Sequence, residues 1–505
     1  MKRLLFMALA CLGVSYFAQA QVPADALRFS SYDVLGTART LGIGGGIGAL
    51  GADFSVIGTN PAGIATFRRS EFSISPSFYI NNTESDLDQA NSAPTSESKL
   101  AFNLNNLGLV FARQGRNPNW RTANLAIGIN RIATFQQTFR YVGESTGSYI
   151  DFFQEASIDL EPSQLNDFNT GLAFDVGALF EVGEPDLFYE TDVELNENAL
   201  LRKEQTVTRR GGINEISLAY AGNFKERLMI GFAIGFPILS YSEEKNYSEE
   251  DVADEVDFYR SLQFNEDLTT TGSGANLKLG FIWRISQAIR LGGAIHTPTT
   301  YTLTDDYETS IVYDFVDGNS EGPLEATSPE SQFEYTFKTP WRFVGSAGII
   351  VGRSGFISGE VEYLNYGGAN FDLTENDGRQ STVDFEQGLN TDIANIYQSA
   401  VNIRLGGEIA LDILRLRAGI QVTGTPYAAS YVNDNPNLNG LGDTQQSISL
   451  GIGVREKNFF VDLGARFAQF DNTFEPYVVT DFYPQNTVSN SSRRSHLLLT
   501  FGYKF

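Results

Sequence analysis

Apolar and polar residues alternate with a period of two along most of the chain. In the C-terminal stretch, one face carries Leu497, Leu499, Phe501, Tyr503 and Phe505, and the other carries mainly small and polar residues. This alternation places one face of an extended strand in an apolar medium and the other in a polar one. The pattern predicts about fourteen strands, at residues 70–82, 98–114, 121–139, 211–224, 226–244, 269–286, 287–305, 332–352, 354–371, 398–412, 413–430, 443–456, 457–474 and 491–505.

The connections between these segments alternate between short and long. The short ones are residues 224–226, 286–287, 352–354, 412–413 and 455–458. The long ones lie near residues 140–210, 245–268, 306–331, 372–397, 431–442 and 475–490. Short periplasmic turns and long outer loops are typical of bacterial outer-membrane barrels. We therefore predict an all-β fold, a 14-stranded antiparallel transmembrane β-barrel formed by residues 70–505 in the bacterial outer membrane, with outer-membrane lipid around it.

The connection at about 140–210 is too long to be an idle loop, and we interpret it as an extracellular insert. Its stretch 151–201 mixes acidic residues with Phe and Leu, which predicts short amphipathic helices above the barrel mouth. Composition supports the barrel as a whole. The chain has 49 Gly, 38 Phe and 22 Tyr but only 3 Met and 3 Trp, and no segment after Ala20 has the unbroken apolar run of a membrane helix.

Residues 1–20 are predicted to be a signal peptide. Lys2 and Arg3 precede a short apolar stretch, and Ala18-Gln19-Ala20 supplies the small-x-small pattern that a signal peptidase cuts after. Cys11 suggests lipoprotein processing as an alternative, but the residues before it fit a lipobox poorly. Because Cys11 is the only cysteine, the mature chain has no disulfide and no thiol nucleophile.

Charge and histidine content exclude several functional classes. The formal net charge is −25, and no basic patch is available to neutralise phosphates, so nucleic acid is not expected as a partner. His296 and His496 are the only histidines, and neither has metal-ligand or catalytic-triad spacing. We therefore predict that the protein is not an enzyme and that it uses no metal and no cofactor.

A glycine-rich run at residues 42–48 lies just before the first predicted strand. It lacks the Gly-Lys-Ser/Thr ending of a phosphate loop, and no βαβ unit surrounds it. Glycine also permits close backbone approach, which a segment threaded through a barrel needs. We therefore predict that residues 21–69 form an N-terminal hatch, or plug, inside the lumen.

The stretch 45–65 resembles the N-terminal hatch of the FadL/TodX family of outer-membrane transporters for long-chain fatty acids and aromatic hydrocarbons. The most specific part of the match is the run Asn60, Pro61, Ala62 and Gly63. Residues 272–280 and 294–298 are similar to mid-barrel stretches of that family. The C-terminal strand ending in Phe505 resembles both the family and the general signal that the barrel-assembly machinery reads.

The resemblance implies a monomeric 14-stranded barrel that is plugged by its hatch. A small hydrophobic substrate would land on the extracellular loops, enter the barrel and pass when the hatch shifts. The insert at 140–210 would correspond to the landing site, although it does not match the family residue by residue. We predict that Ile57, Ile64 and Phe67 are the hatch side chains that contact the barrel interior or the ligand.

Two further features concern the barrel wall. Pro298, Pro340 and Pro426 each follow a threonine near a predicted strand. They mark either a bulge or inward kink that lines a pocket or opens the wall sideways, or strand ends near the outer rim, and we favour strand ends. Charged residues on the face away from lipid are expected to form ion pairs between neighbouring strands that brace the wall. These residues are Glu360, Glu362, Arg404, Glu408, Arg415, Arg417, Asp462 and Arg466.

Two alternatives to a hydrophobic-solute transporter remain open. A barrel of the same fold could be an anchor or shuttle in protein secretion or surface attachment, with the acidic loops and the insert as its docking surface. A general polar porin would need an open lumen.

Overall fold

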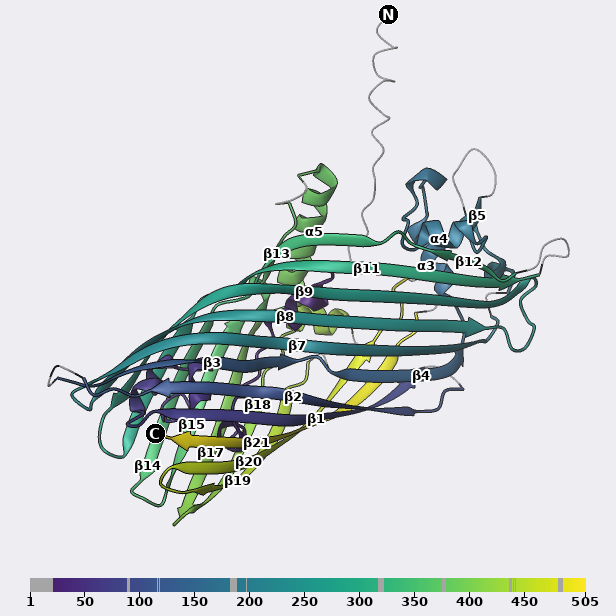
Figure 1. The fold of residues 1–505 in the computed structure, drawn as a ribbon. Helices are drawn as coiled ribbons and strands as arrows, with labels where there is room; N and C mark the ends of the chain where they lie inside the picture. The colour runs from purple at the N-terminus through teal and green to yellow at the C-terminus, as the bar shows by residue number, and fades with distance from the viewer. Residues whose placement is uncertain are drawn as a thin grey trace, which may run out of the picture.

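A computed structural model of the protein describes residues 21–88, 91–115, 117, 119–181, 189–196, 198–316, 322–374, 378–435, 438, 440, 442–479 and 485–505. The predicted signal peptide, residues 1–20, lies outside these residues. In the described part of the chain, a single antiparallel sheet closes on itself as a barrel of 14 strands (Figure 1). Closure occurs where β1 (Glu71–Leu87) pairs with β21 (Val488–Lys504). The prediction of a 14-stranded antiparallel barrel is confirmed.

The remaining wall strands follow one another in chain order around the barrel. Three of them are interrupted, and each of these is named by two labels. In sequence they are β2 (Thr95–Phe111), β3 (Trp120–Thr134) with β4 (Gln137–Ser145), β7 (Leu201–Phe224), β8 (Leu228–Glu250), β9 (Tyr259–Arg284), β10 (Ile289–His296) with β11 (Thr300–Phe315), β13 (Ser331–Lys338) with β14 (Arg342–Val351), β15 (Gly355–Asn365), β17 (Ser399–Leu411), β18 (Leu414–Thr423), β19 (Gln445–Arg455) and β20 (Phe459–Phe474). The short β16 (Asn370–Asp372) pairs with β13, and β12 (Leu324–Thr327) pairs with β11.

The outer face of the wall is apolar and the inner face is mainly polar. On β9, for example, Leu277, Leu279 and Phe281 are exposed while the alternate Lys278 is buried. This arrangement is what a lipid bilayer requires, because most of the wall satisfies its backbone hydrogen bonds between strands and presents apolar side chains outward. No helix within the described ranges is long and apolar enough to cross a membrane.

Several strands extend further than their sequence pattern predicts. β7 begins at Leu201 rather than near 211, β8 continues to Glu250, and β9 begins at Tyr259. The insert therefore occupies residues 146–200 between β4 and β7 rather than 140–210. These extensions lack the outward row of apolar residues that marks a membrane strand, because their outer faces carry polar and charged residues and their inner faces mix apolar with charged ones.

Figure 1 shows the extended strands reaching well beyond the rest of the barrel, with the insert at their far end. The insert contains α3 (Tyr149–Ala156), η3 (Pro162–Gln164), α4 (Thr170–Asp175), the strand pair β5 (Phe180–Glu181) and β6 (Tyr189–Glu190), and η4 (Asp192–Asn196). Tyr149 packs its ring against Tyr247 of β8 and Phe264 of β9, with centroids 5.0 and 5.1 Å apart. The buried Glu249 of β8 accepts the backbone N–H of Tyr149 at 3.1 Å.

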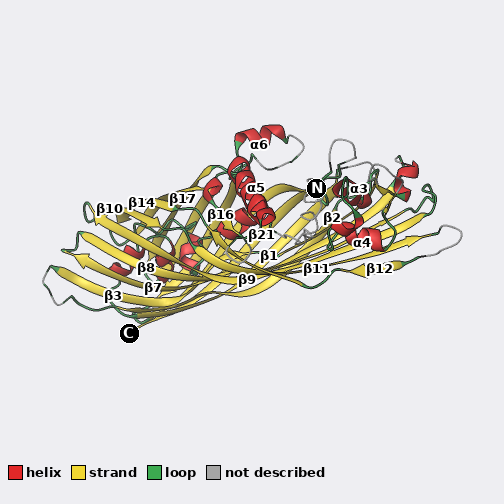
Figure 2. Cartoon of the chain, turned by 90° about the horizontal axis from the view of Figure 1, so that it is seen from above, coloured by secondary structure: helices red, strands yellow, loops and turns green. Residues whose placement is uncertain are grey.

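Two further helices lie on the extracellular side of the shorter strands, apart from α3 and α4 (Figure 2). They are α5 (Gln380–Ile396) and α6 (Ala429–Asp434), with the short η5 (Tyr366–Gly368) preceding β16. Leu389 and Ile393 are buried on one face of α5 and join an apolar cluster with Phe371. The opposite face of α5 is polar and exposed, as expected for an amphipathic surface helix.

The N-terminal segment, residues 21–69, lies inside the barrel. It contains α1 (Pro23–Ser30), α2 (Ala38–Gly42), η1 (Phe54–Gly58) and η2 (Pro61–Thr66), and nearly all of its side chains are buried. α2 contacts β20 and β19, whereas η2 contacts β7, β8 and β9. The segment therefore reaches from one side of the lumen to the other.

Candidate functional site in the barrel lumen

A single side chain holds the turn that the sequence singled out. Asn60 is the N-cap of η2, and its Oδ1 accepts the Ala62 N–H at 3.1 Å. Its Nδ2 donates to the carbonyl oxygens of Gly48 and of Phe281 in β9, both at 2.9 Å. Asparagine at the N-cap followed by Pro61 in the first helical position is a strong helix start. Asn60 thus joins two parts of the N-terminal segment to the wall.

The wall accepts this turn because it lacks side chains there. A Cβ added at Gly280 of β9 would lie 2.1 Å from Asn60 Oδ1, and one at Gly231 of β8 would lie 2.6 Å from the Ala62 nitrogen. Within the turn itself, a Cβ at Gly63 would lie 2.5 Å from Val56 Cγ2. Glycine is required at all three positions for the close approach.

Replacing Asn60 with Ala is expected to loosen this attachment. The change removes the hydrogen bonds of Asn60 to the Gly48 and Phe281 carbonyls and to the Ala62 N–H, and each buried group left unpaired costs about 1–3 kcal/mol. We expect faster hydrogen exchange in residues 45–65 and a lower unfolding temperature, both measured on the purified barrel. Asn119→Ala, in an exposed turn, is the matched control. Unchanged exchange in Asn60→Ala would show that these bonds do not hold the segment.

The three side chains predicted to contact the barrel interior or the ligand are buried in one apolar cluster. Ile57 and Ile64 are fully buried and Phe67 nearly so, together with Ala126 of β3 and Met229 of β8. The structure therefore places all three against the inner wall. Their contact with a ligand stays a prediction.

Ion pairs between neighbouring strands connect the wall to the N-terminal segment. Arg404 of β17 is 1% exposed and pairs with Glu360 at 2.9 Å and with Glu362, both on β15. Glu362 also pairs with Arg342 of β14 at 3.0 Å. The second oxygen of Glu360 accepts the backbone N–H of Gly48 at 2.9 Å. The predicted bracing between strands is confirmed here, and it extends to the N-terminal segment.

A second group of ion pairs lies further along the same part of the wall, on β17, β18 and β20. Arg417 of β18 pairs with Glu408 of β17 and with Asp462 of β20, each at 2.7 Å. Arg39 of α2 lies 3.5 Å from the same Glu408. Arg466 of β20 donates to both carboxylate oxygens of Asp33 at 3.1 and 3.0 Å. Arg415 lies 3.7 Å from Glu408, so every charge that the sequence placed in the lumen has an ionic partner.

The prolines interrupt two neighbouring strands at the same level. Pro298 lies between β10 and β11, and Pro340 lies between β13 and β14. Thr339 donates its N–H to the Thr299 carbonyl at 3.0 Å, so the two breaks lie side by side. The strand-end interpretation is wrong for these two prolines, because both strands resume beyond the break. Pro426 instead lies after the end of β18.

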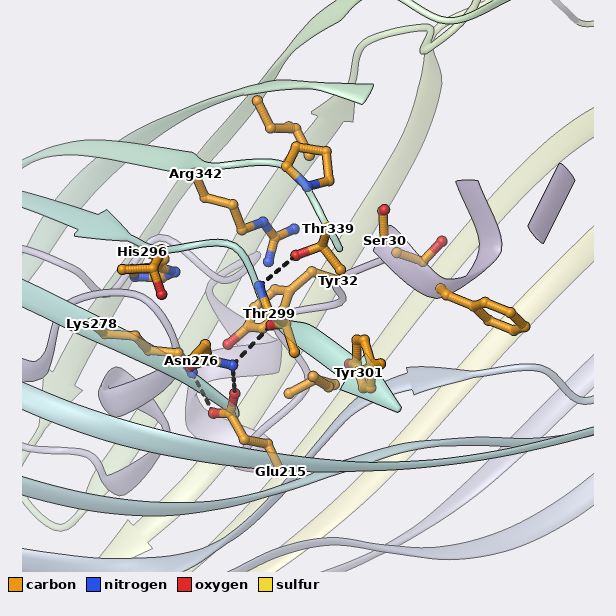
Figure 3. A pocket seen from close by; sticks show the side chains of 16 residues that line it. Ser30, Tyr32, Glu215, Asn276, Lys278, His296, Thr299, Tyr301, Thr339 and Arg342 are labelled. Atoms are coloured by element: carbon orange, nitrogen blue, oxygen red, sulfur yellow. Dashed lines mark hydrogen bonds and ion pairs between the residues drawn. The ribbon is translucent and has the colours of Figure 1, made fainter. Parts of the chain in front are cut away.

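A polar cluster lies on the inner side of these two strand breaks and contacts the N-terminal segment (Figure 3). Glu215 of β7 pairs with Lys278 of β9, and both side chains are 2% exposed. Tyr32 donates its hydroxyl to the Gly58 carbonyl at 2.7 Å, and burial raises the pKa of that hydroxyl, which keeps its proton. His296 Nε2 is hydrogen bonded to the Thr59 carbonyl at 3.0 Å. The cavity between these groups is about 30 Å³, enough for about two waters.

A larger cavity opens above the N-terminal segment and has a volume of about 390 Å³, within the range of small-molecule sites. Residues 133–137 line one side of it, where β3 ends and β4 begins. Its aromatic lining residues are Tyr32, Phe135, Tyr241, Tyr366, Tyr427 and Phe470, and its charged ones are Arg28, Asp33, Arg209, Asp443, Asp471 and Arg494. The cavity therefore offers both ring faces and polar groups.

The backbone pairing of the barrel wall has a gap beside this cavity. β2 pairs with β3 only from Asn106↔Asn130 to Phe111↔Leu125. Beyond that point the chain bends, and β4 packs inside the barrel, where Phe139 meets Phe474 of β20 at a centroid distance of 5.0 Å. Within the described ranges, residues 95–105 of β2 have a pairing partner only on their β1 side. Phe102, next to this free edge, is 66% exposed.

Comparison with known proteins identifies the fold. The chain matches no protein-family model and no curated protein. Among solved structures it is similar to a Pseudomonas aeruginosa FadL homologue, with a TM-score of 0.52, 10% identity and coverage of 94% of this chain and 100% of that chain. The chain has the FadL fold. It is also similar to the P. putida toluene transporter TodX (TM-score 0.47, 10% identity, 94% and 99% covered) and the Ralstonia pickettii toluene transporter TbuX (0.45, 11%, 93% and 98%).

A FadL-fold barrel with an apolar outer face is a multi-pass protein of the outer membrane, so the predicted localisation is confirmed. The gap in pairing beside β2 in this FadL-fold chain was not predicted from the sequence. One sequence feature could have indicated it: residues 131–137 break the apolar–polar alternation of the predicted strand 121–139. The sequence also gave no indication that Tyr32 and Asp33 would join the lumenal networks.

Proposed function

We propose that the protein is a gated outer-membrane channel for small hydrophobic molecules and that residues 21–69 are its hatch. One observation carries the proposal: the cavity above the N-terminal segment reaches the bend where the wall stops pairing with β2. Residues 133–137 belong to both, since they line the cavity and form the bend that ends the β2–β3 pairing. A solute in the cavity would leave sideways along the unpaired edge of β2, and hatch residues such as Ala24, Leu27 and Arg28, which line the same cavity, would control access to that route.

Such a route suits hydrophobic solutes. Beside the gap in pairing, the outer wall is apolar, and a molecule that leaves sideways passes directly into lipid, which is favourable by roughly 25 cal/mol per Å² of apolar surface removed from water. A polar solute would lose its hydration on the same path. Straight passage to the periplasm is obstructed by the buried N-terminal segment, which argues against a general polar porin. The proposal includes no catalytic step and no cofactor.

The remaining parts of the chain fit this proposal. Residues 1–20 would direct export and be removed after Ala20. The insert and the aromatic groups near it would form the first contact for substrate at the extracellular end. Phe505 ends the last strand and would be read by the barrel-assembly machinery. The barrel would act as a monomer.

Mass spectrometry of lipid extracts tests the substrate class. The protein is purified from its native membrane in mild detergent and its bound molecules are extracted. We expect a stoichiometric apolar molecule, such as a fatty acid or hydrocarbon, because the cavity and the gap in pairing adjoin. A barrel that carries no such molecule and retains a protein partner would instead support the secretion-shuttle alternative. Loss of uptake with intact secretion in a deletion strain would separate the two in the cell.

A further inference from the structure

A buried carboxylate without a cation lies beside the start of the N-terminal segment. Asp305 of β11 is 3% exposed. Its Oδ1 accepts from the Thr270 hydroxyl at 2.6 Å and the Tyr335 hydroxyl at 3.2 Å, and its Oδ2 accepts from Gln21 Nε2 at 2.6 Å. No Lys, Arg or His among the described residues forms an ion pair with it. Three neutral donors do not compensate a buried negative charge as a cation would.

The other buried acids nearby have their cations. Asp25 of α1 pairs with Arg28, and its carboxylate also accepts the Val22 N–H at 3.2 Å. Glu243 of β8 pairs with Arg209 and has Lys245 at 3.8 Å. Asp305 is therefore the exception in this part of the lumen.

Gln21 is the residue that connects Asp305 to the chain start. It is 2% exposed, and its Oε1 is buried without a hydrogen-bond partner. Its backbone nitrogen is linked to Nε2 through four carbon atoms, so that nitrogen is held in the same part of the lumen as the carboxylate. The sequence Ala18-Gln19-Ala20 predicts cleavage immediately before it.

We propose that removal of the signal peptide creates the missing cation: the α-ammonium group of Gln21 forms a buried ion pair with Asp305 and fixes the start of the N-terminal segment in the lumen. Hydrolysis of the Ala20–Gln21 bond consumes one water and yields a carboxylate on Ala20 and an amino group on Gln21. That amino group takes up a proton at neutral pH. In the uncleaved precursor the same nitrogen is an uncharged amide, so the segment docks fully only after processing.

Chemical labelling of the α-amino group tests this pairing. The mature protein is purified from outer membranes, its N-terminus is established by mass spectrometry, and the folded barrel is treated with 2-pyridinecarboxaldehyde, which is selective for α-amines. We expect labelling to be at least about tenfold faster in Asp305→Asn than in wild type, because the amide releases the ammonium group. Asp306→Asn is the matched control, since Asp306 is the next residue but faces outward, where it accepts from Gln332. It should label like wild type.

A second comparison keeps the test decisive if Asp305→Asn does not fold. Wild-type barrel should label at least about tenfold more slowly when folded than after heat unfolding, because the paired amine is buried. Equal rates in the two states would overturn the proposal. So would a mature N-terminus other than Gln21, or one cyclised with loss of ammonia, because neither places an ammonium group at this position.

Discussion

Oxidation of an Ala49→Cys/Gly348→Cys variant is expected to abolish uptake, and reduction to restore it. Ala49 lies in the N-terminal segment and Gly348 in β14 of the wall. A Cβ built at Gly348 lies 3.7 Å from the Cβ of Ala49, within the range of about 3.5–4.5 Å that a disulfide spans. The bond would fix the segment to the wall. If the segment must shift for passage, uptake of radiolabelled oleate or toluene by cells will fall to the level of a deletion strain.

The controls for this experiment come from the same chain. Cys11, the only native cysteine, precedes the predicted cleavage site, so no native thiol competes in the mature protein. Each single variant should take up the probes with or without oxidant. The reduced double variant shows whether the substitutions themselves impair the channel. Unchanged uptake after complete cross-linking would show that the segment does not move and that the hatch proposal is wrong.

Arg404→Met is expected to destabilise the barrel by about 3–5 kcal/mol, the usual cost of removing one partner from a buried ion pair. Arg404 is 1% exposed and is the cation of Glu360, whose other contact is the Gly48 N–H. Glu362 keeps Arg342, so Glu360 bears most of the loss. The temperature at which the folded band disappears on unboiled gels should fall clearly below that of wild type.

Arg210→Met is the matched control for this change. Arg210 pairs with Glu244, but both side chains are about 40% exposed, and exposed pairs contribute about 0–1 kcal/mol. Its unfolding temperature should therefore stay close to that of wild type. Because Glu360 also holds Gly48, Arg404→Met should additionally increase hydrogen exchange in residues 45–50. Equal effects of the two variants would show that the lumenal network does not stabilise the barrel.

The sequence by itself determined the barrel. Alternation over 491–505 or 413–430 identifies a strand with one face in lipid, and lipid enforces that alternation at every second residue. The same reason explains why some strands were predicted too short. β7 extends back to Leu201 and β8 forward to Glu250, where the outer face is polar and the inner face mixes apolar residues such as Val207 and Tyr247 with charged ones, so the lipid-facing apolar row that marks a membrane strand is missing. The motif at residues 60–63 could be recognised from the sequence because its four residues are consecutive.

Only the tertiary structure decided the features on which function depends. The bend after Asn130 leaves a gap in the pairing of the wall because β2 has no further partner there, and a break between two strands is not a property of either strand alone. Pro298 and Pro340 are far apart in sequence, so their alignment in neighbouring strands depends on register. Arg404, Glu360 and Gly48 likewise meet only after the barrel has closed around the N-terminal segment. Contacts between residues distant in sequence arise from closure, and alternation within one strand contains no information about them.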